Sequence, residues 1–161
     1  TRHIWQAPDG DTFFYSLWKP ELPADRMPRA LVVGVHGLSG AALDYEPYEP
    51  LGSHLRPHGI VTVALELRGQ GNDPRIERRG DLFAIEDWFG DLRAFFALIR
   101  SRYPLVPIYY YGESMGAALL IRFLAQAGEV DLPAGLILAS PVVALANRTP
   151  WWQEQIVRFV I

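Results

Sequence analysis

The chain has 161 residues, of which 50% are hydrophobic and 20% charged, and its net charge is −3. This size and composition suit one domain with a buried core, and they exclude a chain that is disordered over most of its length. The acidic balance argues against a nucleic-acid partner, the lack of cysteine excludes disulfides and thiolate metal sites, and no apolar run approaches the roughly 20 residues of a membrane span.

The first 28 residues predict a β-hairpin followed by a surface loop. Strands are expected over 1–6 and 12–19, because the Asp9-Gly10-Asp11 step between them suits a tight turn. Residues 20–28 are rich in proline, which indicates a loop.

Four short apolar runs follow, each ended by small or polar residues. They cover 30–35, 60–65, 108–111 and 136–139, without alternation between apolar and polar positions. Such continuous runs are typical of parallel strands that are covered on both faces. We therefore expect each run to be a buried strand of one sheet.

Helices are expected between these strands, over 48–57, 85–102 and 115–127. Apolar residues recur every three or four positions in 85–102, as on a helix that packs against a sheet. The segment 115–127 is rich in alanine and leucine and stops at Gly128, a typical residue after a helix end. The alternation of strand and helix predicts an α/β fold, with a mainly parallel sheet and helices on both faces.

Residues 150–161 indicate the beginning of one more helix, with an apolar end. We expect the chain to be truncated before its last strands, with a cap or lid starting at about 147–161. Trp151 and Trp152 fit either core packing or a lid over a substrate entrance.

The segment 112–116, Gly-Glu-Ser-Met-Gly, fits the G-x-S-x-G pattern between an expected strand and an expected helix. Such a sharp turn lifts the Ser114 hydroxyl above the strand ends and predicts Ser114 as a nucleophile. Side chains at Gly112 and Gly116 would collide with neighbouring backbone. The Met115 amide would lie at a helix N-terminus, where donors stabilise a developing oxyanion.

The loop after the strand 30–35 is the expected source of the second oxyanion donor. Gly37 allows the backbone to approach a substrate, and the Leu38 amide would point inward. His36 is interpreted as a buried histidine that supports this loop, and the alternative is a general base.

These motifs together resemble the α/β-hydrolase superfamily. The most similar group is that of monoacylglycerol lipases and lysophospholipase-like hydrolases, which overlaps with serine aminopeptidase-like hydrolases. The resemblance covers roughly residues 10–145 and rests on four blocks: 35–37, 67–71, 85–87 and 112–116.

The second block departs from the pattern of these relatives, which usually carry Asp-x-Arg-Gly-His-Gly-x-Ser. Glu66, Gln70 and Asn72 replace three of those residues here. We interpret the block as a structural turn and expect no effect on function. Glu113 also replaces the commoner histidine before the serine.

The resemblance implies that 1–161 is the N-terminal part of a single α/β-hydrolase domain. It implies a serine ester hydrolase that forms an acyl-enzyme and acts on monoacyl lipids or small carboxylic esters. The alternatives are an aminopeptidase-type serine hydrolase and a non-catalytic hydrolase-like domain used for binding.

Two of the three catalytic groups of such an enzyme are missing from the sequence. The expected chain order is serine, acid, histidine, and no histidine follows Ser114. The acids after it are Glu129, Asp131 and Glu154, none at a suitable strand end. We therefore expect the base and acid to come from residues beyond 161 or from a partner chain, and the strand at 136–139 to be an open apolar edge.

We expect neither a cofactor nor a metal. The loop aspartates have no paired histidines or ligand spacing, and we interpret them as solvated turn residues. They are Asp9, Asp11, Asp25, Asp44, Asp73 and Asp81.

Overall fold

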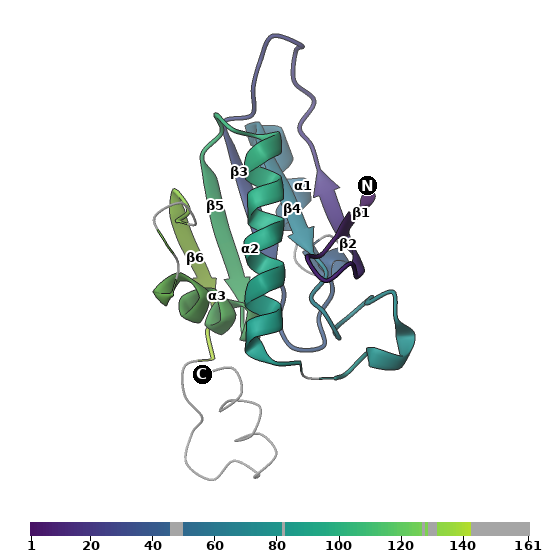
Figure 1. Cartoon of the computed structure of the whole chain (residues 1–161). Coiled ribbons are helices and arrows are strands. Elements are labelled where there is room, and N and C mark those ends of the chain that lie inside the picture. The colour runs from purple at the N-terminus through teal and green to yellow at the C-terminus, as the bar shows by residue number, and fades with distance from the viewer. Residues whose placement is uncertain (46–49, 82, 127, 129–131, 143–161) are drawn as a thin grey trace.

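The computed structural model of the chain describes residues 1–45, 50–81, 83–126, 128 and 132–142. Its strands are β1 (Arg2–Gln6), β2 (Thr12–Trp18), β3 (Ala30–Val35), β4 (Ile60–Leu65), β5 (Ile108–Glu113) and β6 (Gly135–Ala139). They form one sheet in the order β1-β2-β4-β3-β5-β6 (Figure 1). The predicted hairpin and the four predicted strands are all present, and β5 continues two residues beyond its apolar run. The expected burial holds for β3 and β4 and for alternate residues of β5, whereas β6 is largely exposed.

The sheet is antiparallel at one end and parallel over the rest. β2 pairs antiparallel with both β1 and β4, and the strands β4, β3, β5 and β6 are parallel. In this register Val35 lies opposite both Leu65 and Gly112. The carboxyl ends of the parallel strands therefore meet along one edge, where ligand sites form in such sheets.

Helices cover both faces of the sheet, as predicted. α2 (Ile85–Arg102) and α3 (Met115–Ala125) share one face, where the Phe123 ring contacts the rings of Phe89 and Phe96. Phe96 also stacks on Tyr110 of β5, with 3.8 Å between ring centroids. This face holds the larger apolar core, because alternate residues of β3, β4 and β5 place their side chains on it together with those of α2 and α3.

The opposite face is covered by shorter elements. The 3-10 turn η1 (Ala42–Tyr45) lays the Tyr45 ring against Gly34 of β3, and the ring meets Tyr111 edge-on at 5.7 Å. α1 (Leu51–Leu55) packs its Gly52 backbone on the Trp18 ring. Apolar side chains thus pack against both faces of the central strands, in two separate clusters.

Two predicted helix boundaries were wrong. α3 ends at Ala125, two residues earlier than predicted, and Gly128 does not adopt the left-handed conformation of a helix-ending glycine. The helix predicted over 48–57 is α1 followed by the 3-10 turn η2 (Arg56–His58), and Gly59 ends it with a φ of 75°. The segment 147–161, with Trp151 and Trp152, lies outside the described residues. No helix in the described ranges is both long and apolar enough to cross a membrane.

β6 forms an apolar edge. In the described part of the chain it pairs with β5 alone, and Leu136, Ile137 and Leu138 are 37–46% exposed although they point to alternate faces. A strand with one free edge and apolar side chains is a template for pairing with another chain.

When residues 1–161 are produced alone, we expect them to self-associate through β6. Ile137→Lys places a charge on this edge. It should raise the concentration needed for association by at least about tenfold, which corresponds to a loss of about 1.4 kcal/mol of association free energy. Sedimentation velocity would measure it. Leu105→Lys is the control, because Leu105 is exposed in the turn after α2 and lies outside the sheet. Equal association of the wild type and Ile137→Lys would contradict this role of β6.

Candidate active site

Ser114 lies at the joint between β5 and α3 in a strained backbone conformation. Its φ is 50° and its ψ is −114°. In the described ranges the other non-glycine residues with positive φ are Ser39 and Ser140, which follow the ends of β3 and β6. Such residues cost roughly 1–3 kcal/mol each and gather at functional sites. The strain is held in place by neighbours, because the Ser114 amide donates to Ala139 O at 2.9 Å.

Two glycines allow the tight turn around Ser114. A Cβ added to Gly112 would lie 2.6 Å from the Ala117 Cα, and one added to Gly116 would lie 2.2 Å from Val35 O. Both contacts are with backbone, which cannot move aside. The first turn of α3 therefore rests directly on the end of β3, as the motif predicts for these two positions.

The loop after β3 contacts the serine side chain. A Cβ added to Gly37 would lie 3.2 Å from the Ser114 Cβ and 3.8 Å from its Oγ, so the Gly37 backbone passes directly beside the hydroxyl. The amides of Leu38 and Met115, the predicted oxyanion donors, donate no hydrogen bond to any residue in the described ranges.

His36 is fully buried, and both of its ring nitrogens are in use. The Leu67 amide donates to Nε2 at 3.1 Å, so Nε2 carries no proton, and Nδ1–H then donates to Gly37 O at 2.8 Å. Burial lowers the pKa of His36, against a smaller opposing effect of Glu66. These contacts favour a neutral histidine that supports the loop, and they leave no free nitrogen for a general base.

The segment after β4, which we interpret from the sequence as a structural turn, also holds the loop after β3 in place through its side chains. The buried Glu66 carboxylate accepts from the amides of Ala42 at 3.1 Å and Asn72 at 2.6 Å. The side-chain oxygen of the buried Gln70 accepts from the backbone amide of Ser39 at 3.0 Å. Sequence analysis missed these roles, although two polar residues at the end of a buried strand are a signal of buried hydrogen bonding.

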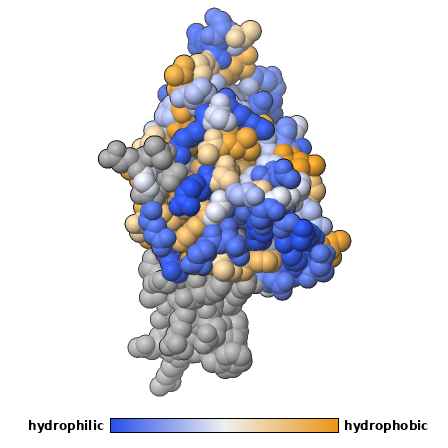
Figure 2. Space-filling model, in the orientation of Figure 1, coloured by the Kyte–Doolittle hydropathy of each residue, from blue (hydrophilic) through white to orange (hydrophobic). Residues whose placement is uncertain are grey.

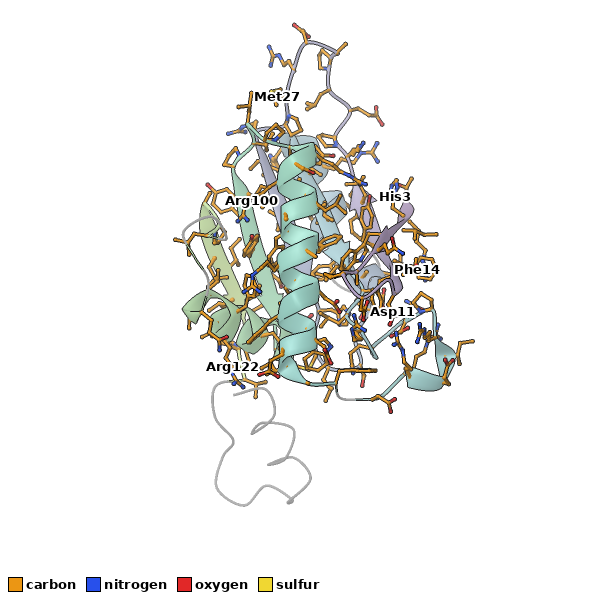
Figure 3. The ribbon with its side chains drawn as sticks, viewed as in Figure 1. His3, Asp11, Phe14, Met27, Arg100 and Arg122 are labelled. Atoms are coloured by element: carbon orange, nitrogen blue, oxygen red, sulfur yellow. The ribbon has the colours of Figure 1, made fainter. Side chains whose placement is uncertain are left out.

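The interpretation of the loop aspartates as solvated was wrong for Asp11 and Asp73. Asp73 is fully buried and accepts from the Gly69 and Arg75 amides at 2.7 and 2.8 Å. Asp11 lies in the hairpin turn and faces the loop that carries η3 (Ile76–Arg78), where Arg68, Arg75 and Arg78 pair with it. Figure 2 shows hydrophilic side chains gathered over that loop. The arginines explain the burial, since an unpaired carboxylate could not be desolvated.

Arg68 connects this cluster to α2. Its guanidinium donates to both carboxylate oxygens of Asp91, each at 2.8 Å, and to Asp9 at 2.6 Å. The hydrogen bonds to Asp91 raise the pKa of Arg68, so it stays charged. The Trp88 indole donates to the Arg68 carbonyl at 3.0 Å. The loop after β4 is thereby fixed to the hairpin and to α2.

The structure brings none of the other histidines to Ser114. His3 is in β1, at the far end of the strand order, and His54 and His58 lie in α1 and η2, before the amino end of β4. Glu129, Asp131 and Glu154 fall outside the described ranges. No cluster of three potential metal-ligating side chains occurs in the part of the chain that the structure describes.

This sheet, with a strained serine between β5 and α3, is typical of an α/β-hydrolase. The chain matches the family described as serine aminopeptidase, S33, over residues 26–161. It therefore belongs to that family, within the monoacylglycerol lipase-like group of α/β-hydrolases.

Relatives and solved structures agree with this assignment. The chain is 32% identical to a monoglyceride lipase homolog of Monkeypox virus over 84% of its length and 45% of that protein. It is 30% identical to the monoglyceride lipase of Rattus norvegicus over 90% of its length and 44% of that protein. The chain thus spans less than half the length of these relatives.

The fold is similar to that of a soluble monoglyceride lipase variant from Saccharomyces cerevisiae. The TM-score is 0.78 at 21% identity, over 97% of this chain and 49% of that one. An α/β serine hydrolase without a lid from Xanthomonas campestris gives a TM-score of 0.68 at 23% identity, over 94% of this chain and 64% of that one. At these identities the likeness concerns the fold.

Gly116→Ala should destabilise the protein by about 3 kcal/mol or more, because its Cβ would overlap the Val35 carbonyl. Gly90→Ala is the matched control in α2, where an added Cβ meets nothing within 4 Å. That substitution should stabilise by about 0.5–1 kcal/mol. Urea unfolding of both variants would test the pair, and equal effects would show that the contact at Gly116 is relieved by movement.

The burial of His36 predicts a pH dependence of stability. The folded state binds this proton less readily than the unfolded chain, whose histidine titrates near 6.5. The contribution of neutral His36 to the free energy of unfolding should therefore be complete above pH 6.5. It should fall as the pH drops from 6.5 toward the lowered pKa, by up to about 1.4 kcal/mol per pH unit.

His36→Gln should remove this component, whereas His54→Gln, at an exposed position of α1, should retain it. Urea unfolding at pH 7.5, 6.5 and 5.5 measures the slope. The same slope in wild type and His36→Gln would show that His36 is protonated as readily in the folded state.

Proposed function

We propose that this chain carries the nucleophile of a serine ester hydrolase. The observation that supports this most directly is Ser114, held at a φ of 50° with the Gly37 backbone beside its hydroxyl. A protein without catalytic use for this serine gains nothing from the strain, because a relaxed turn would connect β5 and α3 at lower energy. This argues against a domain used for binding alone.

In the proposed reaction the Ser114 Oγ attacks the carbonyl carbon of an ester. The carbonyl oxygen becomes an oxyanion that accepts from the amides of Leu38 and Met115, and the alcohol leaves as the acyl-enzyme forms. Water then attacks the acyl group and releases the acid, and Ser114 regains its proton. The dipole of α3, whose N-terminus lies at Ser114, favours the negative charge.

The base that accepts the Ser114 proton and the acid that orients this base are proposed to come from residues beyond 161 or from a partner chain. His36 is unsuitable because Leu67 and Gly37 occupy its two nitrogens. In this proposal 1–161 is the N-terminal part of one α/β-hydrolase domain, and about 147–161 begins its cap. No resident cofactor takes part.

The proposed substrates are monoacyl lipids or small carboxylic esters, because the relatives with 30–32% identity are named monoglyceride lipases or their homologs. The second candidate is peptide hydrolysis, which the family description, serine aminopeptidase, favours. Both chemistries use the same nucleophile and oxyanion donors, so the substrate alone separates them.

Ser114→Ala, in the longest natural form of the protein, should lower ester turnover by about 10⁴-fold or more with the fold intact. The same variant should lose labelling by a fluorophosphonate probe. Ser101→Ala is the matched control, since the Ser101 hydroxyl is exposed on α2 and bonds to the Leu98 carbonyl. Labelling that persists in Ser114→Ala would remove Ser114 from the mechanism.

A panel of p-nitrophenyl esters and amino-acid arylamides would separate the candidate substrates. We expect turnover of the esters. Hydrolysis of arylamides alone would favour the peptidase, and a wild type that is neither labelled nor active would favour a domain used for binding.

A further inference from the structure

We propose that Gln70 is a positioning residue for the oxyanion donor Leu38, an inference that rests on the proposed ester hydrolase. Gln70 lies 32 positions after Leu38 in the sequence and touches the loop from the end of the neighbouring strand β4. Its side-chain oxygen accepts from the Ser39 amide at 3.0 Å, and its side-chain nitrogen donates to the Asp81 carbonyl at 3.1 Å.

The direction of the Leu38 amide depends on the two peptide groups that flank this residue. The Leu38 N–H shares a plane with the Gly37 carbonyl and points away from it, because the peptide group is planar and trans. The Gly37 carbonyl accepts from both the His36 ring at 2.8 Å and the Gly40 amide at 3.1 Å. This fixes the first peptide plane.

The second peptide plane, between Leu38 and Ser39, is held by Gln70. Its N–H is the Ser39 amide that donates to the Gln70 side chain. Ser39 has a φ of 59°, a conformation that a serine adopts only at a cost. Without the Gln70 oxygen the Ser39 amide would lose its partner, and the loop could relax out of this conformation. The Leu38 N–H would then no longer be held in the direction from which it is proposed to donate to the substrate oxyanion.

Gln70 can hold the loop because it is itself immobile. Its side chain is buried, and its backbone amide donates to Leu67 O at 3.0 Å while its carbonyl accepts from the Asp73 amide at 2.9 Å. Asp73 also bonds to the Gly69 amide. The Gln70 side chain thus projects from a rigid turn and transmits that rigidity to the loop.

The consequence is a defect that concerns the transition state more than substrate binding. An oxyanion exists only after Ser114 has attacked, so a misdirected Leu38 amide lowers kcat and leaves KM nearly unchanged. Loss of an oxyanion donor costs about 10²–10³ in kcat, and a donor that is only loosened should cost about tenfold to hundredfold.

The test uses Gln70→Ala, Gln70→His and Gln6→Ala in the longest natural form of the protein, with p-nitrophenyl butyrate as substrate. Gln70→Ala should lower kcat about tenfold to hundredfold with KM within about twofold. Gln70→His should restore kcat to within about threefold, because one imidazole nitrogen accepts and the other donates. Gln6→Ala is the matched control, since the Gln6 amide bonds to the Gly10 carbonyl on the exposed hairpin.

Hydrogen–deuterium exchange of the segment 36–41 provides a readout that is independent of activity. We expect exchange there to be at least about tenfold faster in Gln70→Ala, and unchanged in Gln6→Ala. The thermal midpoint of each variant shows whether the whole fold is altered.

The inference is overturned if the wild type is active and Gln70→Ala retains its kcat, or if Gln70→His fails to restore it at an unchanged thermal midpoint. A wild type without Ser114-dependent turnover overturns the proposed function instead. In that case the exchange experiment still decides whether Gln70 holds the loop, and equal exchange in Gln70→Ala and wild type would refute the clamp itself.

Discussion

The structure depends on the close approach between the first turn of α3 and the carboxyl end of β3. A space of 2.2 Å between the Cβ position of Gly116 and the Val35 carbonyl admits no side chain. This approach brings Ser114 beside the chain that continues from β3, so backbone packing places the nucleophile next to the Gly37 loop. The site is consequently as rigid as the sheet from which it projects.

Backbone packing fixes the serine, whereas polar side chains fix the loop opposite it. The carboxylate of Glu66 and the amide of Gln70 reach from the end of β4, and Arg68 between them holds this segment to Asp91. Buried ion pairs add little net stability, because desolvation offsets most of the attraction. The two-point contact of Arg68 with Asp91 instead restricts how the loop after β4 can sit on α2, because both hydrogen bonds form only in one relative orientation.

The parts of this fold that were predictable from the sequence are those with local physical causes. Continuous apolar runs identified the buried strands, and Gly112 and Gly116 identified the sharp turn, because a missing side chain directly reports a close contact. The ends of α3 and α1 were misjudged, since helix ends follow packing and capping more than composition. The hydrogen-bond partners of Asp73 and Gln70 were not predictable for another reason. The side chain of Gln70 bonds to Ser39, 31 residues away, and only the assembled sheet brings the two together. Asp73 is held by near neighbours in the sequence, the Gly69 and Arg75 amides, but its burial depends on how the whole loop packs.

The order of the strands has a consequence for how the protein is synthesised. After the hairpin, β3 and β4 form the first parallel pair, and each later strand joins the free side of the strand before it in space: β5 joins β3, and β6 joins β5. No later strand in the described residues must be inserted between two strands already paired. From β4 onwards the sheet can therefore assemble in the order in which the ribosome releases it, because β4 joins β3 to the hairpin and β5 and β6 each dock on a strand that is already present. The turn around Ser114 is complete only when β6 docks, because the Ser114 amide donates to Ala139 O.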